Sequence, residues 1–186
     1  MNIQTYFADF KDKIDECLAD AGHLKALSQS VQLLKKAGTK NAVFLVGNGG
    51  SAGIAEHMAI DLTKNAGLRA MTISGTPMLT TFANDFGYEQ VYAKALEAFA
   101  RPGDVLIAIS SGGTSKNILN AVRTAKMRKM KVITFSGFNA GNPLRRMGDI
   151  NIWVNSRAFG YVELIHNLLI HYINDAIIGK TEYMIR

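Results

Sequence analysis

Four polar side chains fall into two pairs whose spacing suits acid–base or metal chemistry. His57 and Asp61 are four residues apart in a stretch with helical spacing, so they share one helix face. Glu163 and His166 are three apart late in the chain and also share a face. Imidazole and carboxylate groups transfer protons near neutral pH and also bind divalent metals. Each histidine alone could be an ordinary packed residue, but its pairing with a carboxylate favours a functional interpretation.

Two short loops of small residues could bind a phosphate. Residues 47–51 read GNGGS, and residues 110–115 read SSGGTS. Each loop follows an apolar run and opens a helical stretch, so backbone N–H groups and serine hydroxyls would face an anion. The alternative is that Ser51 and Ser115 are ordinary helix N-caps. The sequence has neither a GxGxxG nor a GxxxxGK[ST] pattern, which disfavours a dinucleotide or ATP site.

The elements that must position these residues alternate between strands and helices. Apolar runs predict strands at 42–46, 68–73, 104–109, 131–135 and 150–154. Helical spacing predicts helices at 4–20, 23–37, 51–64, 116–128 and 159–178, with a broken helical stretch over 76–100. This alternation predicts an α/β fold with a doubly wound, five-stranded parallel sheet in the flavodoxin-like order 2-1-3-4-5, preceded by two helices. The two serine loops would then meet in one crevice.

Composition limits the class of protein. The length of 186 residues predicts a single domain over 1–186, and 48% hydrophobic residues suffice for a real core. The net charge of +6 favours anionic partners. Cys17 is the only cysteine, which excludes a disulfide framework and a cysteine-based zinc site. Without an apolar span or a signal-peptide pattern, we expect a cytoplasmic protein that does not contact membranes.

The stretches that carry these residues resemble the SIS (sugar isomerase) domain family, and within it the phosphoheptose isomerases. They read GNGGSAGIAEHMAIDLT at 47–63, ANDFGYEQVYAKALEAFARPGDVLIAISSGGTSKNIL at 83–119, MKVITFSG at 130–137 and VELIHNLLIH at 162–171. The resemblance implies isomerisation of sedoheptulose 7-phosphate to D-glycero-D-manno-heptose 7-phosphate, at the entry to bacterial heptose biosynthesis for lipopolysaccharide or capsule. It also implies a homotetramer, with residues 1–38 used in assembly.

The resemblance assigns roles to individual residues. It implies that the substrate is bound by Asn48, Gly49, Gly50, Ser51, Asp85, Ser110, Ser111, Gly112, Ser115 and Glu163. It implies catalysis by Asp61 and His166, which would move protons through an enediol. Zinc or another divalent metal would be held by His57, Asp61, Glu163 and His166. From spacing alone, the stretch around Asp85 is a plain turn.

This chain departs from the family at several of these positions. Asp61 replaces the usual Glu, and Glu163 replaces the usual Gln. Asn65 stands where an arginine is expected, and Gly160 where an aspartate is expected. Gly112 and Thr114 replace the usual Ser and Asn of the second loop. The phosphate loops are thus kept better than the sugar contacts, which leaves isomerisation of another phosphorylated sugar as an alternative.

Two further alternatives come from other classes of protein. One SIS relative is a non-catalytic, tetrameric scaffold that binds the replication initiator, and it shares the fold and the phosphate loops. The four paired polar residues favour an enzyme over that scaffold. A sugar-phosphate sensor or nucleic-acid binder is the other alternative. The densest basic run lies at 123–131 and is typical of a solvated helix end, so we do not expect nucleic acid as a partner.

Overall fold

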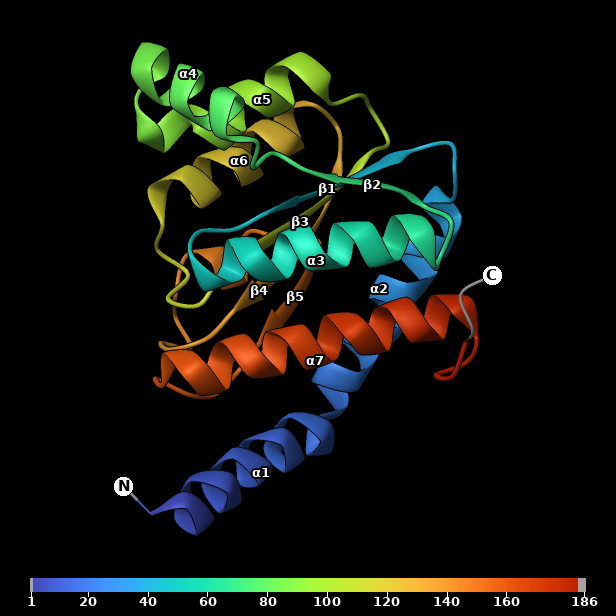
Figure 1. Ribbon diagram of the computed structural model, residues 1–186, viewed down its shortest axis with the longest axis vertical. Helices are drawn as coiled ribbons and strands as arrows, with labels where there is room; N and C mark the ends of the chain where they lie inside the picture. Colours follow the sequence, from blue (N-terminus) through green and yellow to red (C-terminus); the bar gives the residue numbers. More distant parts are fainter. Residues whose placement is uncertain (1, 184–186) are drawn as a thin grey trace.

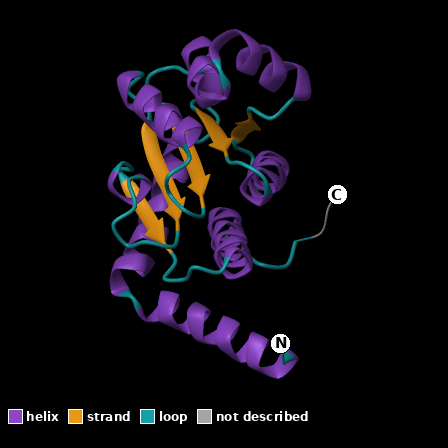
Figure 2. Ribbon diagram, turned by 90° about the vertical axis from the view of Figure 1, so that its left-hand side faces the viewer, coloured by secondary structure: helices purple, strands orange, loops and turns teal. Residues whose placement is uncertain are grey.

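The computed structural model describes residues 2–183, which form a parallel sheet between two layers of helices (Figures 1 and 2). The strands are β1 (Ala42–Val46), β2 (Arg69–Thr72), β3 (Val105–Ser110), β4 (Lys131–Ser136) and β5 (Ile150–Trp153). Their spatial order is β2-β1-β3-β4-β5, and every pairing is parallel. The predicted doubly wound sheet and its strand order are therefore confirmed.

The helices begin and end close to where the hydrophobic spacing predicted. They are α1 (Ile3–Ala19), α2 (Ala21–Ala37), α3 (Gly50–Lys64), α4 (Thr76–Phe86), α5 (Val91–Phe99), α6 (Lys116–Met127) and α7 (Phe159–Ile178), with short 3-10 turns at Tyr88–Gln90 and Leu144–Arg146. The predicted break in the stretch 76–100 falls at Gly87, whose φ of 82° ends α4. Gly38 ends α2 with a φ of 53°, as predicted.

Each face of the sheet has its own core because side chains alternate along a strand. Val43 and Leu45 of β1 pack with α2, α3 and α7 on one face, whereas Phe44 and Val46 pack with α5 and α6 on the other. The helices α3 and α7 lie side by side on the first face, and their contact positions the candidate site (Figure 1). No helix within residues 2–183 is long and apolar enough to cross a membrane.

Helix α1 extends away from the sheet, and its main contacts are with α2 and α7 (Figures 1 and 2). Asn2 caps it by accepting a hydrogen bond from the backbone N–H of Gln4 at 2.8 Å. Tyr6 and Phe10 pack against Tyr161 of α7. On the same face of α1, one to two turns nearer its start, Ile3 and Phe7 remain exposed.

Candidate functional site

The two serine loops form one cavity at the carboxyl ends of β1 and β3. The cavity has a volume of about 130 Å³ and is lined by Asn48, Ser51, Ile109, Ser110, Ser111, Gly112, Ser115, Phe159 and Glu163. Its walls combine hydroxyl groups with the N-terminal turn of α3, whose backbone N–H groups favour an anion. We call this group of residues the cradle. Its geometry suits a phosphate group, with no lysine or arginine among the lining residues.

The serines of the cradle do not cap helices with their side chains. Ser51 lies inside the first turn of α3, whose N-cap is Gly49. Ser115 is the N-cap residue of α6, but its hydroxyl accepts a hydrogen bond from Ser110 Oγ at 3.2 Å and caps nothing. The hydroxyl of Ser111 is buried and has no hydrogen-bond partner among the described residues. A buried hydroxyl without a partner is costly, so a ligand oxygen would satisfy it.

Backbone freedom lets the cradle loops take this shape. Gly49 and Gly113 both have positive φ angles, 53° and 66°, which are readily adopted by glycine. A side chain at Gly47 would collide with the carbonyl oxygen of Ser51. The side chain of Asn48 is fixed by hydrogen bonds with Asn117 and with the hydroxyl of Tyr88, which donates to Asn48 Oδ1 at 3.0 Å.

Glu163 joins the cradle to a second cavity. This residue of α7 lies so close to Gly50 that a Cβ there would collide with its carboxylate. It also lines a neighbouring cavity of about 470 Å³ together with His57, Gly160 and Asn167. Because both cavities share Glu163, a ligand anchored in the cradle could extend past this carboxylate toward His57.

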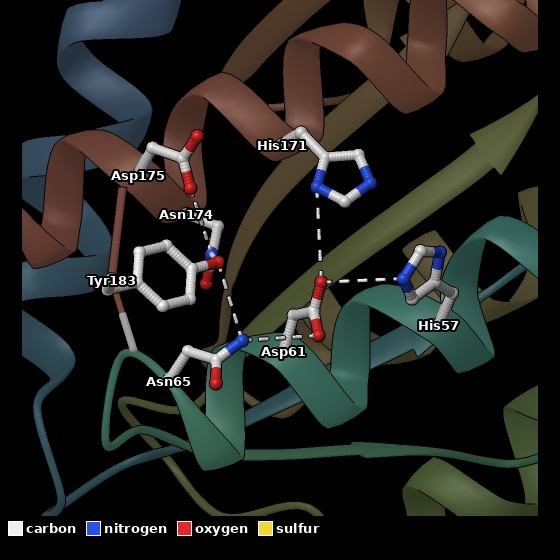
Figure 3. Close-up of polar contacts among 7 residues, drawn as sticks. All are labelled: His57, Asp61, Asn65, His171, Asn174, Asp175 and Tyr183. Carbon is white, nitrogen blue, oxygen red and sulfur yellow. Dashed lines mark hydrogen bonds and ion pairs between the residues drawn. The ribbon is translucent and has the colours of Figure 1, made fainter. Parts of the chain in front are cut away.

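A cluster of three titratable residues lies between α3 and α7. Asp61 Oδ2 is 3.4 Å from His57 Nε2 and 3.9 Å from His171 Nδ1 (Figure 3). The two imidazole rings have centroids 5.1 Å apart. The Asp61 side chain is 18% exposed, whereas those of His57 and His171 are 55% and 35% exposed. Asp61 is thus shielded and flanked by two accessible imidazoles, an arrangement suited to proton transfer.

The structure corrects the predicted place of His166. This residue is completely buried, and its Nε2 lies 3.1 Å from the carbonyl oxygen of Ser136, against the ring of Phe135. Burial lowers the pKa of His166 to about 4, so the imidazole is neutral at physiological pH. The resemblance implied that His166 lies beside Asp61 as a catalytic and metal-binding residue. In the structure it is His171 that lies beside Asp61.

The cluster also fits a divalent metal. One ligand atom from each of His57, Asp61 and His171 lies within 4.8 Å of the other two. Two imidazoles and a carboxylate form a donor set typical of catalytic zinc, which keeps one position open. The predicted ligands His57 and Asp61 are therefore together, with His171 as the third. Glu163 lines the cradle, and it is not part of this group of three within the described chain.

Comparisons with known proteins place the chain in a family. A model of the SIS domain matches residues 5–137. The chain belongs to the SIS domain family. Within it, the phosphoheptose isomerase of Helicobacter pylori (strain P12) is 36% identical over 182 residues, which cover 94% of this chain and 93% of that protein. The phosphoheptose isomerase of Thiobacillus denitrificans is 38% identical over 143 residues, 73% of each chain. The similarity thus falls in the phosphoheptose isomerase group.

Solved SIS structures agree with this assignment. The phosphoheptose isomerase from Neisseria gonorrhoeae superposes with a TM-score of 0.86 at 30% identity, covering 94% of this chain and 97% of that one. The one from Francisella tularensis has the same TM-score at 29% identity. A Vibrio vulnificus NanR protein complexed with ManNAc-6P has a TM-score of 0.71 at 18% identity. That level of identity shows a shared fold alone.

One predicted contact lies away from the cradle, and several site residues were missed. Asp85 is exposed in the last turn of α4, where it accepts a hydrogen bond from Asn84, and it does not line the cradle. The sequence patterns assigned no catalytic or binding role to His171, Tyr88 or Asn117, which the structure places at the cluster or beside the cradle. A polar stripe at Glu163, Asn167 and His171, each four residues apart, was the signal that would have identified His171.

Proposed function

We propose that this chain is an aldose–ketose isomerase that converts sedoheptulose 7-phosphate to D-glycero-D-manno-heptose 7-phosphate in heptose biosynthesis. Its SIS family membership and its similarity to phosphoheptose isomerases support this substrate. The observation that carries the proposal is the position of Asp61 between two histidines, on the same helix whose first turn contributes to the cradle. A scaffold protein would have no need for this cluster.

The cradle would bind the phosphate of the open-chain sugar. The hydroxyls of Ser51, Ser110, Ser111 and Ser115 and the backbone at the start of α3 would donate hydrogen bonds to the phosphate oxygens. The unpartnered hydroxyl of Ser111 supports this role. His57 lies six residues after Ser51, roughly 9 Å along the helix axis. The carbon chain would therefore extend from the cradle past Glu163 and bring C1 and C2 to the cluster.

Proton transfer would take place at Asp61 and His171. The Asp61 carboxylate would remove a proton from C1 of the ketose, which gives an enediol, and would return a proton to C2. His171 would move the hydroxyl proton from O1 to O2, so that the product carries an aldehyde at C1. A divalent metal such as zinc, held by His57, Asp61 and His171, would polarise the carbonyl group when bound.

We further propose that copies of this chain assemble into a homotetramer, in which residues 1–38 serve assembly of one SIS domain over 1–186. Large apolar side chains are exposed on α1 and α7, including Ile3, Phe7, Leu164, Leu168 and Tyr172. Such an apolar surface is typical of a subunit interface. Light scattering of the purified protein would measure the assembly, and Phe7→Glu should dissociate it. Location in the cytoplasm stays a prediction from the sequence.

An NMR assay with sedoheptulose 7-phosphate tests the function directly. The purified protein should form the aldose phosphate, and Asp61→Asn should lower kcat by about a hundredfold or more. Glu56→Gln is a matched control, because Glu56 is an exposed carboxylate of the same helix, outside the cradle and the cluster. A parallel reaction with a chelator tests the metal. Failure to convert this sugar, with conversion of another ketose phosphate, would reassign the substrate.

A further inference from the structure

The carboxylate of Asp61 also accepts a hydrogen bond on the side that faces away from the histidines. Its Oδ2 atom lies between His57 and His171, while its Oδ1 accepts a hydrogen bond from Asn65 Nδ2 at 3.3 Å (Figure 3). Asn65 follows one turn later, at the C-terminal end of α3. The last torsion of an aspartate side chain is broad and weakly defined by itself. The orientation of this carboxylate therefore depends on its partners.

A tyrosine beyond the end of α7 fixes Asn65 in turn. The chain turns at Gly179, whose left-handed φ of 88° ends α7, and Tyr183 then lies between α3 and α7 (Figure 3). Its hydroxyl accepts hydrogen bonds from Asn65 Nδ2 and Asn174 Nδ2, both at 3.4 Å. A carboxylate only accepts, so Asn65 must turn its amide nitrogen toward Asp61. The second hydrogen of the same nitrogen is then donated to the hydroxyl of Tyr183.

We propose that Asn65 and Tyr183 are positioning residues that hold the Asp61 carboxylate with Oδ2 between the two histidines. The proposal rests on the proposed function, in which Asp61 transfers protons and binds the metal. Neither residue belongs to the cluster or to the lining of the cradle. They act through Asp61, as partners behind a ligating carboxylate do at many metal sites. The terminal segment after α7 thus contributes to the geometry of a site formed by two helices.

The core of the protein does not depend on this hydrogen-bonded chain. The buried residues between the sheet and α3 include Met58 and Leu62, and those under α7 include Leu169 and Ile173. Tyr183 lies outside both hydrophobic clusters. Removal of its hydroxyl should leave folding intact, so an effect on the site can be separated from an effect on stability.

The test compares Asn65→Leu, Tyr183→Phe and the double variant with the full-length wild type. Titration with Co²⁺, followed by its visible absorption, measures the cluster without any turnover. Asn65→Leu should weaken Co²⁺ binding and lower kcat by about tenfold, with KM for sedoheptulose 7-phosphate nearly unchanged. Tyr183→Phe should weaken Co²⁺ binding and lower kcat by about threefold. This effect is smaller than that of Asn65→Leu because it passes through Asn65. The double variant should be no worse than Asn65→Leu alone.

The controls separate the possible failures. Asn120→Leu removes an amide of α6 that bonds to the carbonyl of Glu89, and it should leave Co²⁺ binding unchanged. If the wild type binds Co²⁺ or turns over the sugar and both single variants match it, the positioning proposal is overturned while the function stands. If no sugar is converted but Co²⁺ binding weakens in the variants, the proposed function fails and positioning is supported. A wild type that neither binds Co²⁺ nor turns over the sugar overturns both. Should Asn65→Leu fail to fold, Tyr183→Phe alone decides.

Discussion

The first turn of α3 and the middle of the same helix contain two different kinds of site. The cradle at the first turn is formed by two loops that follow neighbouring strands, and its shape depends on glycines and backbone N–H groups. The cluster in the middle depends on side chains of α3 and α7 that meet only because these helices pack together. One site is a property of short segments, and the other is a property of packing.

This difference separates the two tasks of the proposed reaction. In that reaction the cradle would bind the phosphate, which does not change during isomerisation, so its serines should mainly affect KM. The cluster would act on C1 and C2, where protons move, so it should mainly affect kcat. Glu163 links the two sites, because it lines both the cradle and the cavity that contains His57.

The largest expected effect distinguishes the two histidines of α7. His171→Gln should lower kcat by about a hundredfold or more with little change in KM, because it removes the group beside Asp61 that is proposed to transfer a proton. His166→Gln should keep kcat within a few fold, since His166 is buried against Ser136. Steady-state kinetics of both variants would measure this. The opposite result would return the catalytic role to His166.

The pH dependence of stability should report the buried histidine. An unfolded histidine takes up a proton near pH 6.5, whereas burial keeps His166 neutral in the folded protein until about pH 4. Stability should therefore fall as the pH drops from 6.5 toward 4, by up to about 3 kcal/mol from this group. Urea unfolding at pH 7, 5.5 and 4.5 would measure it. His166→Gln should flatten this dependence, and an unchanged slope would contradict the assignment.

Loss of a hydroxyl in the cradle should weaken substrate binding. Ser111→Ala removes a buried donor that has no partner within the described chain, and it should raise KM by about tenfold with a smaller effect on kcat. Ser28→Ala, an exposed position on α2, is the matched control. If Ser111→Ala instead lowered kcat by about tenfold without raising KM, the cradle would do more than bind phosphate.

The smallest expected effect concerns the charge of Glu163. Its carboxylate lines the cavity proposed for an anion, so Glu163→Gln should lower KM for the sugar phosphate by roughly fivefold. Isothermal titration with inorganic phosphate would detect the same gain without turnover. A loss of phosphate affinity would show that this carboxylate supports the cradle in another way, for example by orienting the first turn of α3.

Much of the framework was predictable because it depends on local patterns. The strand over 42–46 and the helix ends at Gly38 and Gly87 follow from hydrophobic spacing and glycine positions. The strand order follows from the alternation of strands and helices, which allows few topologies. Since parallel strands end at one edge of a sheet, even the meeting of the two serine loops could be predicted.

The partner of Asp61 was decided by the tertiary structure. His166 and His171 are five residues apart, which places them roughly 140° apart around a helix axis. His166 shares the buried face with Val162, Ile165 and Leu169, whereas His171 lies beside α3. The sequence by itself determined that α7 carries two histidines and the carboxylate of Glu163. Only packing decided which side of α7 meets α3, because that depends on how both helices fill the space over the sheet.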